Sequence, residues 1–310
     1  MKSLFIIGNG FDLDHKLPTS YEHFREYLQK TYAGLEDMSP SYSISSTLMP
    51  DGEEVYVEKE VASFLMDIIS RAEGYGDWKD VEASLGKLDF EEYLGEMAYL
   101  LDDDNDEGDL MKRVARNEDA SLHFYRVTIK IKDIFSKWID SISLRGVNAK
   151  KSFQNLIDRE NDIFLTFNYT RVLEEIYETE DVFHIHGEQG GPIVIGHGEF
   201  RDEEFYNRYI GSEEHLEEIH EALRKDTNAI IFKSSYFFKE LKDIDSIFTY
   251  GFSFSNVDIP YLKVILKRLS TDNVTWYLND YDREEKREEY KEKMKSCGFK
   301  GKFATFTCKE

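Results

Sequence analysis

Short, nearly continuous apolar runs separated by helical patterns limit what this 310-residue chain can fold into more than any other feature. Runs such as DIFLTF and SIFTY are typical of strands that helices cover on both faces. Alternation of such strands with helices favours an α/β fold with a mostly parallel, Rossmann-like sheet. We predict strands at 2–7, 162–167, 182–186, 192–196, 246–250, 274–278 and 302–307, and helices at 170–178, 258–269 and 282–296.

The long gap between the first two predicted strands has a different character. Its apolar residues recur at helical spacing, beginning with the stretch from Val57 to Ile69. We therefore predict a large helical insertion after the first strand, and a smaller acidic insertion later in the chain. The predicted parts are an α/β core at 1–20 and 156–310, a helical insertion at 21–155, and a smaller acidic insertion at 199–243 within the core.

The charge and the cysteine content exclude several classes of protein. The chain has 39 basic and 62 acidic residues, for a formal net charge of -23, which repels a phosphate backbone, so we expect no nucleic-acid partner. Its two cysteines, Cys297 and Cys308, lack the paired spacing of a structural zinc site, and we expect reduced thiols. No stretch approaches the ~20 apolar residues of a membrane helix. We expect a cytoplasmic protein with no membrane partner.

The first strand runs directly into the turn Gly8-Asn9-Gly10-Phe11. Glycines allow a sharp bend, and they expose N–H groups that can receive a phosphate or a ribose. The dinucleotide-binding fingerprint is only half met, because position 13 is Leu. A purely structural turn is the alternative. The corner Leu17-Pro18-Thr19 follows within a few residues and is expected to shape a loop over any ligand.

Polar residues follow several of the later strands. Asn168 lies where a strand ends and a helix begins, at the sheet edge where ligands collect, although it is also placed to cap that helix. In the run VFHIHGE, an imidazole near the strand end has the pKa range of a general base. The two histidines of this run face the same side if the strand is regular, and a bulge would swap them. The further candidates are His184, His186, His197, Gly251, Ser253 and Asn279.

The order of these pieces resembles that of the sirtuins. Gly8 to Asp12, followed by Leu17-Pro18-Thr19, is similar to the sirtuin opening. Phe167-Asn168-Tyr169, His186-Gly187, Gly251-x-Ser253 and Leu278-Asn279 follow in the sirtuin order. The chain departs from the pattern where Asp12 replaces a Ser and Thr170 replaces an Asp. It also lacks the zinc module, which disfavours deacylation.

A closer resemblance spans nearly the whole chain. The segments GNGFDLDHKLPTSYEHF, WKDVEASLG, TFNYT, HIHGE, GHGE and GFSFSNVD resemble the bacteriophage abortive infection AbiH family. This resemblance implies a phage-defence effector that harms the infected cell. Defence proteins with sirtuin-like domains are often NAD hydrolases, so together the resemblances imply cleavage of NAD to nicotinamide and ADP-ribose.

The resemblance implies roles for particular residues. Asn168 would position the ribose and the attacking water, His186 would act as the base, and Asp12 would stabilise the oxocarbenium-like charge. The turn from Gly8 to Phe11, with Pro18, Thr19, Gly251, Ser253 and Asn279, would bind NAD as substrate, and no metal is expected. Glu82 would either lean over the pocket or serve packing. The partners expected besides the nucleotide are a second copy of the chain or a phage-derived trigger.

Two other functions remain open at the level of the sequence. His184, His186 and His197 have ligand chemistry that suits a metal-dependent hydrolase or nuclease. Alternatively, the pocket senses a nucleotide without catalysis and the helical insertion signals to a partner. Sensitivity to a chelator separates the metal enzyme from the NAD hydrolase, and release of nicotinamide separates the NAD hydrolase from the sensor.

Overall fold

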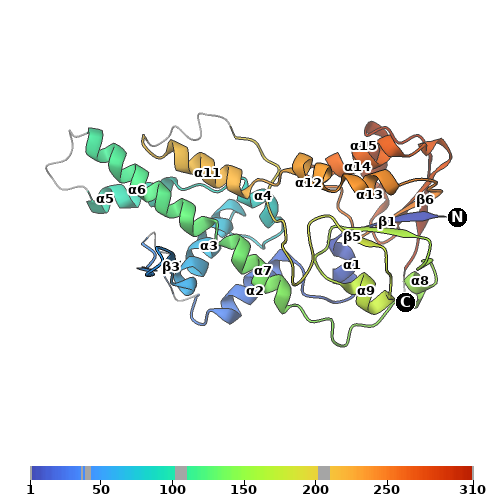
Figure 1. Cartoon of the computed structure of the whole chain (residues 1–310), viewed down its shortest axis with the longest axis horizontal. Coiled ribbons are helices and arrows are strands. Elements are labelled where there is room, and N and C mark those ends of the chain that lie inside the picture. Colours follow the sequence, from blue (N-terminus) through green and yellow to red (C-terminus); the bar gives the residue numbers. More distant parts are fainter. Residues whose placement is uncertain (1, 36–37, 39–42, 102–109, 202–209, 309–310) are drawn as a thin grey trace. The chain divides into compact units, whose positions relative to one another are not determined.

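The computed structural model describes residues 2–35, 38, 43–101, 110–201 and 210–308. The chain divides into two compact units (Figure 1). A sheet unit contains 1–20, 139–194 and 226–310, and a helical unit contains 21–138 and 195–225. Residues 139–155, predicted as part of the helical insertion, lie in the sheet unit, and residues 195–225 lie in the helical unit.

The sheet unit is built on a parallel sheet of six strands, which confirms the predicted Rossmann-like α/β fold. The spatial order is β5-β4-β1-β6-β7-β8. Numbered along the chain, this is third-second-first-fourth-fifth-sixth, the order of a dinucleotide-binding Rossmann sheet. The strands are β1 (Ser3–Ile7), β4 (Ile163–Thr166), β5 (Val182–His184), β6 (Ser246–Tyr250), β7 (Thr275–Asn279) and β8 (Lys302–Phe306).

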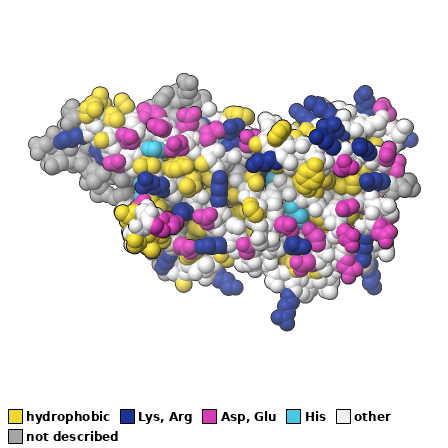
Figure 2. Space-filling view, in the orientation of Figure 1, with side chains coloured by type: hydrophobic (Ala, Val, Ile, Leu, Met, Phe, Trp, Pro, Cys, Tyr) yellow, Lys and Arg dark blue, Asp and Glu magenta, His cyan; other side chains and the backbone are white. Residues whose placement is uncertain are grey.

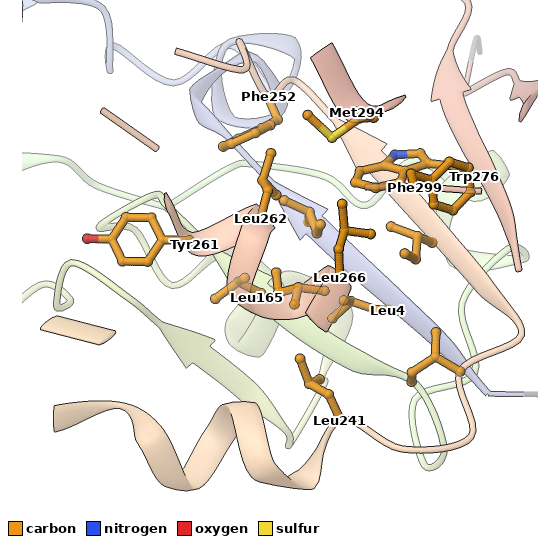
Figure 3. Packing of buried hydrophobic residues seen from close by; sticks show 14 of the residues in the cluster. Leu4, Leu165, Leu241, Phe252, Tyr261, Leu262, Leu266, Trp276, Met294 and Phe299 are labelled. Atoms are coloured by element: carbon orange, nitrogen blue, oxygen red, sulfur yellow. The ribbon is translucent and has the colours of Figure 1, made fainter. Parts of the chain in front are cut away.

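Alternate residues of β1 enter different hydrophobic layers, because successive side chains of a strand point to opposite faces. The Phe5 ring stacks on Phe164 at 5.2 Å and on Phe248 at 4.8 Å between ring centroids, across three adjacent strands. Leu4 and Ile6 belong instead to a cluster that includes Trp276 (Figure 3). Both faces of the sheet are therefore covered, which explains why the strands are apolar throughout.

Helices on both faces of the sheet provide these layers. α14 (Ile259–Arg268) and α15 (Glu284–Ser296) contribute Tyr261, Leu262 and Met294 to the Leu4 cluster. α1 (Asn9–Asp14) and α9 (Val172–Tyr177) contribute Phe11 and Tyr177 to the Phe5 face, through contacts with Phe153. The remaining short elements of this unit are α8 (Lys151–Gln154), α12 (Thr227–Lys233), α13 (Ser235–Glu240) and the 3-10 helix η1 (Thr271–Asn273).

The helical unit has its own aromatic core. Phe24 contacts Trp78 and Trp138, at 5.9 and 5.1 Å between ring centroids. The Trp78 main-chain amide donates to Glu22, and its indole N–H donates to Ser70. The elements are α2 (Tyr21–Thr31), α3 (Glu58–Ala72), α4 (Val81–Leu85), α5 (Glu91–Leu101), α6 (Leu110–Thr128), α11 (Glu213–Leu223), a hairpin of β2 (Ser46–Leu48) and β3 (Glu54–Tyr56), and α7 (Ile131–Ser141), which ends in the sheet unit.

The strand predicted at 192–196 does not form. The Val194 amide donates to the carbonyl of His186, and beyond it His197 makes an isolated parallel bridge with Arg224. This segment therefore exchanges single hydrogen bonds with nearby turns, without joining a ladder. An apolar run of this length is compatible with either arrangement, which is why the sequence pattern misled. In the described ranges, no helix has the length and apolar character needed to cross a membrane.

Candidate functional site

The glycine turn after β1 packs directly against the turn after β6. The Gly8 amide donates to Tyr250 O at 3.0 Å, and the Gly10 amide donates to Gly251 O at 2.9 Å. A Cβ atom added to Gly8 or Gly10 would lie 2.6 or 2.7 Å from the Gly251 main chain. The backbone that lies close to these glycines, at the point where the strand order reverses, is therefore part of the protein. The two amides that we expected to face a ligand donate within the protein.

The other residues of the opening turn have separate environments. Phe11 is buried and packs on Phe153 and Tyr250, as a core residue does. Asn9 is exposed, and its Nδ2 donates to Thr19 O at 2.9 Å, which ties the turn to the Pro18 corner. Pro18 is exposed and Thr19 is buried. The Thr19 hydroxyl has no hydrogen-bond partner among the described residues.

Asp12 and Asn168 form the centre of the candidate site. Asn168 Nδ2 donates to Asp12 Oδ1 at 2.8 Å and to the Gly8 carbonyl at 3.1 Å, so a residue after β4 reaches the turn after β1. Thr170 donates its hydroxyl to the other Asp12 oxygen at 2.6 Å. These polar side chains are all buried, and Asn168 Oδ1 has no hydrogen-bond partner in the described part of the chain.

Burial raises the pKa of Asp12 to about 7, and the hydrogen bonds from Thr170 and Asn168 offset only part of this effect. A carboxyl group whose pKa lies near neutrality is suited to exchange protons under physiological conditions. Its location after β1, near the reversal of strand order, is where Rossmann-like sheets bind ligands. The pair therefore has both the place and the chemistry of a functional site.

The two histidines of the β5 region have different partners, contrary to the expectation that they face the same side. β5 ends at His184, so the alternation of a regular strand does not continue to His186. The His184 ring bonds to Asn168 O at 2.9 Å and to Glu174 of α9 at 2.7 Å. His186 Nε2 lies 3.3 Å from the Tyr261 hydroxyl of α14, and its ring contacts Phe167. The imidazole that is bonded directly to Asn168 is therefore that of His184.

The protonated form of His184 is favoured although the ring is buried. Burial by itself disfavours the protonated ring, but the hydrogen bond and the negative charge of Glu174 outweigh it, so the pKa of His184 is raised. His184, Glu174 and Asp12 thus form an electrostatically coupled group, because His184 also lowers and Glu174 also raises the pKa of Asp12.

His197 and Glu82 belong to the helical unit, where both have polar partners. His197 bonds to the main chain of His220 and Glu199, and burial lowers the pKa of both imidazoles, that of His220 to about 4. Glu82 forms an ion pair with Lys225 at 2.6 Å and accepts from the Gly196 amide at 3.3 Å. Within the described residues, neither His186 nor His197 joins His184 in a group of metal-ligating side chains.

The last two predicted binding residues lie at other strand ends. Ser253 is exposed in the turn that begins at Gly251. Asn279 is the last residue of β7, and its Oδ1 accepts from the Tyr281 amide at 2.9 Å, so it closes a local turn. Among the described residues, neither forms a hydrogen bond with Asp12 or Asn168, and nothing in their local geometry distinguishes them as ribose ligands.

The sequence analysis did not identify Thr170 or Glu174 as parts of the site. Thr170, where the chain departs from the sirtuin pattern, donates a hydrogen bond to Asp12. Glu174 lies in the first turn of α9, which begins at Val172, and Thr170 precedes that helix. α9 has only six residues, too few for a periodic pattern to mark Glu174 in the sequence.

Comparison with known proteins identifies the family. No curated protein and no solved structure matches the chain. A family model described as "Bacteriophage abortive infection AbiH" matches residues 4–280, which include most of β1, the glycine turn, Asp12, Asn168 and β7. The match confirms the resemblance inferred from the sequence segments, and it extends over most of both units. The chain belongs to the bacteriophage abortive infection AbiH family.

Proposed function

We propose that this chain acts in abortive infection against bacteriophage, as an effector that hydrolyses NAD at the bond between nicotinamide and ribose. The defence role is supported by membership of the AbiH family. In the reaction, the bond from ribose C1′ to the nicotinamide nitrogen breaks and a bond from C1′ to the oxygen of water forms. Nicotinamide leaves with the bonding electron pair, and the water gives up one proton.

The observation that carries the proposal is the unpaired carbonyl oxygen of Asn168. Nδ2 of the same side chain is held by Asp12 and the Gly8 carbonyl, while Oδ1 is buried without a partner in the described ranges. An unsatisfied buried acceptor costs about 1–3 kcal/mol. A hydroxyl donor from a ribose, or the attacking water, would recover this cost, so the side chain is preorganised for such a ligand.

Asp12 has the properties that the reaction requires beside Asn168. Its carboxylate, when ionised, stabilises the positive charge that develops on the ribose ring. Its pKa of about 7 also allows it to take the proton that the water releases. His186 remains the proposed base on a ribose hydroxyl. Its Nε2 lies 3.3 Å from the Tyr261 hydroxyl, which would orient the ring.

The direct test is release of nicotinamide from NAD by the purified chain, and loss of intracellular NAD in phage-infected bacteria that express it. The Asn168→Ala variant should lose both. Asn161→Ala is the matched control, since Asn161 is exposed at the opposite end of β4 and bonds only to Asp158 in the described structure. Protection from phage without any fall in NAD, in cells expressing the wild-type chain, would contradict NAD hydrolysis and favour the sensor.

A separate variant tests the base. His186→Ala should abolish release of nicotinamide while NAD binding persists, because the base acts in the chemical step. Retention of full activity in this variant would remove His186 from the mechanism and leave Asp12 as the proton acceptor.

A further inference from the structure

Three side chains beside the candidate site have the composition and spacing of a metal site. Glu174 of α9, His184 at the end of β5, and Glu188 in the following turn each offer a ligand atom, and these atoms all lie within 4.8 Å of one another. We propose that Glu174, His184 and Glu188 bind a divalent transition-metal ion. This inference is independent of NAD hydrolysis, for which no metal is expected.

The hydrogen bonding of His184 is the main support for a cation at this place. Its Nδ1 lies 2.9 Å from the main-chain carbonyl of Asn168, and because a carbonyl only accepts, Nδ1 must carry the hydrogen. Metal-binding histidines are held in this way, with the second ring nitrogen donating to a carbonyl or carboxylate. Once a metal ion displaces the proton on Nε2, the ring presents the lone pair of Nε2 to the ion.

That lone pair faces a carboxylate. Nε2 lies 2.7 Å from Glu174 Oε1, which is a hydrogen-bond distance with a proton between the two atoms. A metal ion would take the place of this proton. A metal ion would draw on Glu174 Oε2 as well, which is buried and has no hydrogen-bond partner in the described chain.

Glu188 completes the set from a more accessible position. Its side chain is 42% exposed and forms an ion pair with Arg171 at 3.2 Å, so it can turn to an ion at little cost. One imidazole and two carboxylates suit Zn²⁺ or Mn²⁺ better than Mg²⁺, which prefers oxygen ligands alone. Three protein ligands leave a further coordination position open to water or to a substrate oxygen.

Two hydrogen bonds connect the location of such an ion to Asp12. His184 donates to the carbonyl of Asn168, and the side chain of Asn168 donates to Asp12. A metal ion on Nε2 would hold the ring in the tautomer that makes the first of these bonds. Through His184, the ion would therefore fix the position of the Asn168 carbonyl without itself binding Asp12 or Asn168.

The test is metal binding by the full chain, measured without NAD. The protein is freed of metal with a chelator, the chelator is removed, and Zn²⁺ is titrated by calorimetry, with Co²⁺ absorption as a second readout of coordination. We expect a single tight site per chain. His184→Ala and Glu188→Gln should each weaken it by ~10- to 100-fold or more. Glu188 is in a turn, so its variant folds even where the loss of His184 disturbs β5.

Matched controls come from neighbouring and similar groups. Glu175→Gln changes the next residue of α9, which is 54% exposed and pairs with Arg171. His215→Ala removes another histidine paired with a glutamate, Glu218, and within the described ranges this pair belongs to no group of three metal-ligating side chains. Both should bind Zn²⁺ as the wild type does. Absence of a tight wild-type site, or unchanged affinity in both His184→Ala and Glu188→Gln, would overturn the proposal and leave NAD hydrolysis untouched.

Discussion

At the scale of single residues, the fold controls the charge of Asp12. It is buried, both its oxygens accept hydrogen bonds, and its pKa is raised to about 7 by burial. A group whose pKa is higher in the folded than in the unfolded chain binds more protons when folded. It therefore stabilises the fold at acidic pH, and this contribution is lost as the pH rises through the folded pKa.

Replacing Asp12 by Asn should remove that dependence on pH. In the wild type, the contribution of Asp12 to the free energy of unfolding should fall between pH 3.8 and about 7, by up to about 4 kcal/mol. The amide keeps an acceptor for Asn168 and gains a donor for Thr170, so the variant should fold. Denaturant unfolding across this range, with a chelator present, measures the difference between the two proteins. Parallel curves would show that Asp12 ionises normally.

Lys225 is a second buried polar residue with a specific partner. Its side chain is 1% exposed and pairs with Glu82, which is 18% exposed. Breaking a buried pair by removing one member leaves an uncompensated charge, whereas removing both does not. This ion pair explains Glu82 in the WKDVEASLG segment better than a role over a pocket does. Glu82 of α4 bonds both to the Gly196 amide and to Lys225.

The pair makes a testable prediction for the helical unit. Lys225→Met should lower the free energy of unfolding by about 3 kcal/mol, and the double variant with Glu82→Gln should recover a large part of that loss. Thermal and denaturant unfolding of the two single variants and the double variant form a complete cycle. If the losses in the single variants simply add, the two charges are not coupled.

At the scale of elements, the glycines after β1 and β6 form a pattern typical of a ligand-binding turn, and close packing of the two turns is enough to explain it. Gly251 has φ of +64°, and a Cβ atom there would lie 2.1 Å from the Phe11 amide nitrogen. The strands β1 and β6 are paired along their full length, so the turns that follow them emerge side by side. A sheet edge of this kind requires small residues whether or not a nucleotide binds.

Gly251→Ala should therefore destabilise the sheet unit far more than backbone strain alone. Gly190→Ala is the control, because Gly190 has φ of +76° in the same unit but no heavy atom within 4 Å of an added Cβ. We expect a loss of about 1 kcal/mol for Gly190→Ala and at least about 3 kcal/mol for Gly251→Ala. Similar losses in thermal unfolding would mean that the turn after β6 can move away from Gly10.

At the scale of the whole molecule, the excess of acidic residues opposes compaction. The formal net charge is -23, although basic and acidic side chains are interspersed on the face shown in Figure 2. Self-repulsion among the excess charges is screened as salt shortens the Debye length from about 30 Å at 0.01 M to about 8 Å at 0.15 M.

Added salt should consequently stabilise the chain. We expect the melting temperature to rise by a few degrees between 0.01 and 0.15 M KCl, which corresponds to roughly 1 kcal/mol. NaCl should have the same effect, because screening does not distinguish the two cations. A fall in melting temperature would show that the surface ion pairs outweigh the net repulsion.

The strands of the sheet unit and three of its helices were predictable, because their sequence patterns are local. Apolar runs located the strands of the parallel sheet, and helical patterns located α9, α14 and α15. The strand predicted at 192–196 was wrong for the same reason. An apolar run indicates that a segment is buried, but it does not indicate which backbone groups form hydrogen bonds with it. The contact between Asn168 and the Gly8 turn followed from topology, because parallel strands end at the same edge.

The sequence by itself determined the family, the alternation of strands and helices, and the residue types available at the carboxyl edge of the sheet. Only the tertiary structure decided which groups meet: Gly251 against Gly10, His184 rather than His186 on Asn168, and Lys225 on Glu82. The physical reason is that periodicity acts over neighbouring residues, whereas these partners are far apart in sequence. Their contacts depend on strand register and on the residue at which each strand ends.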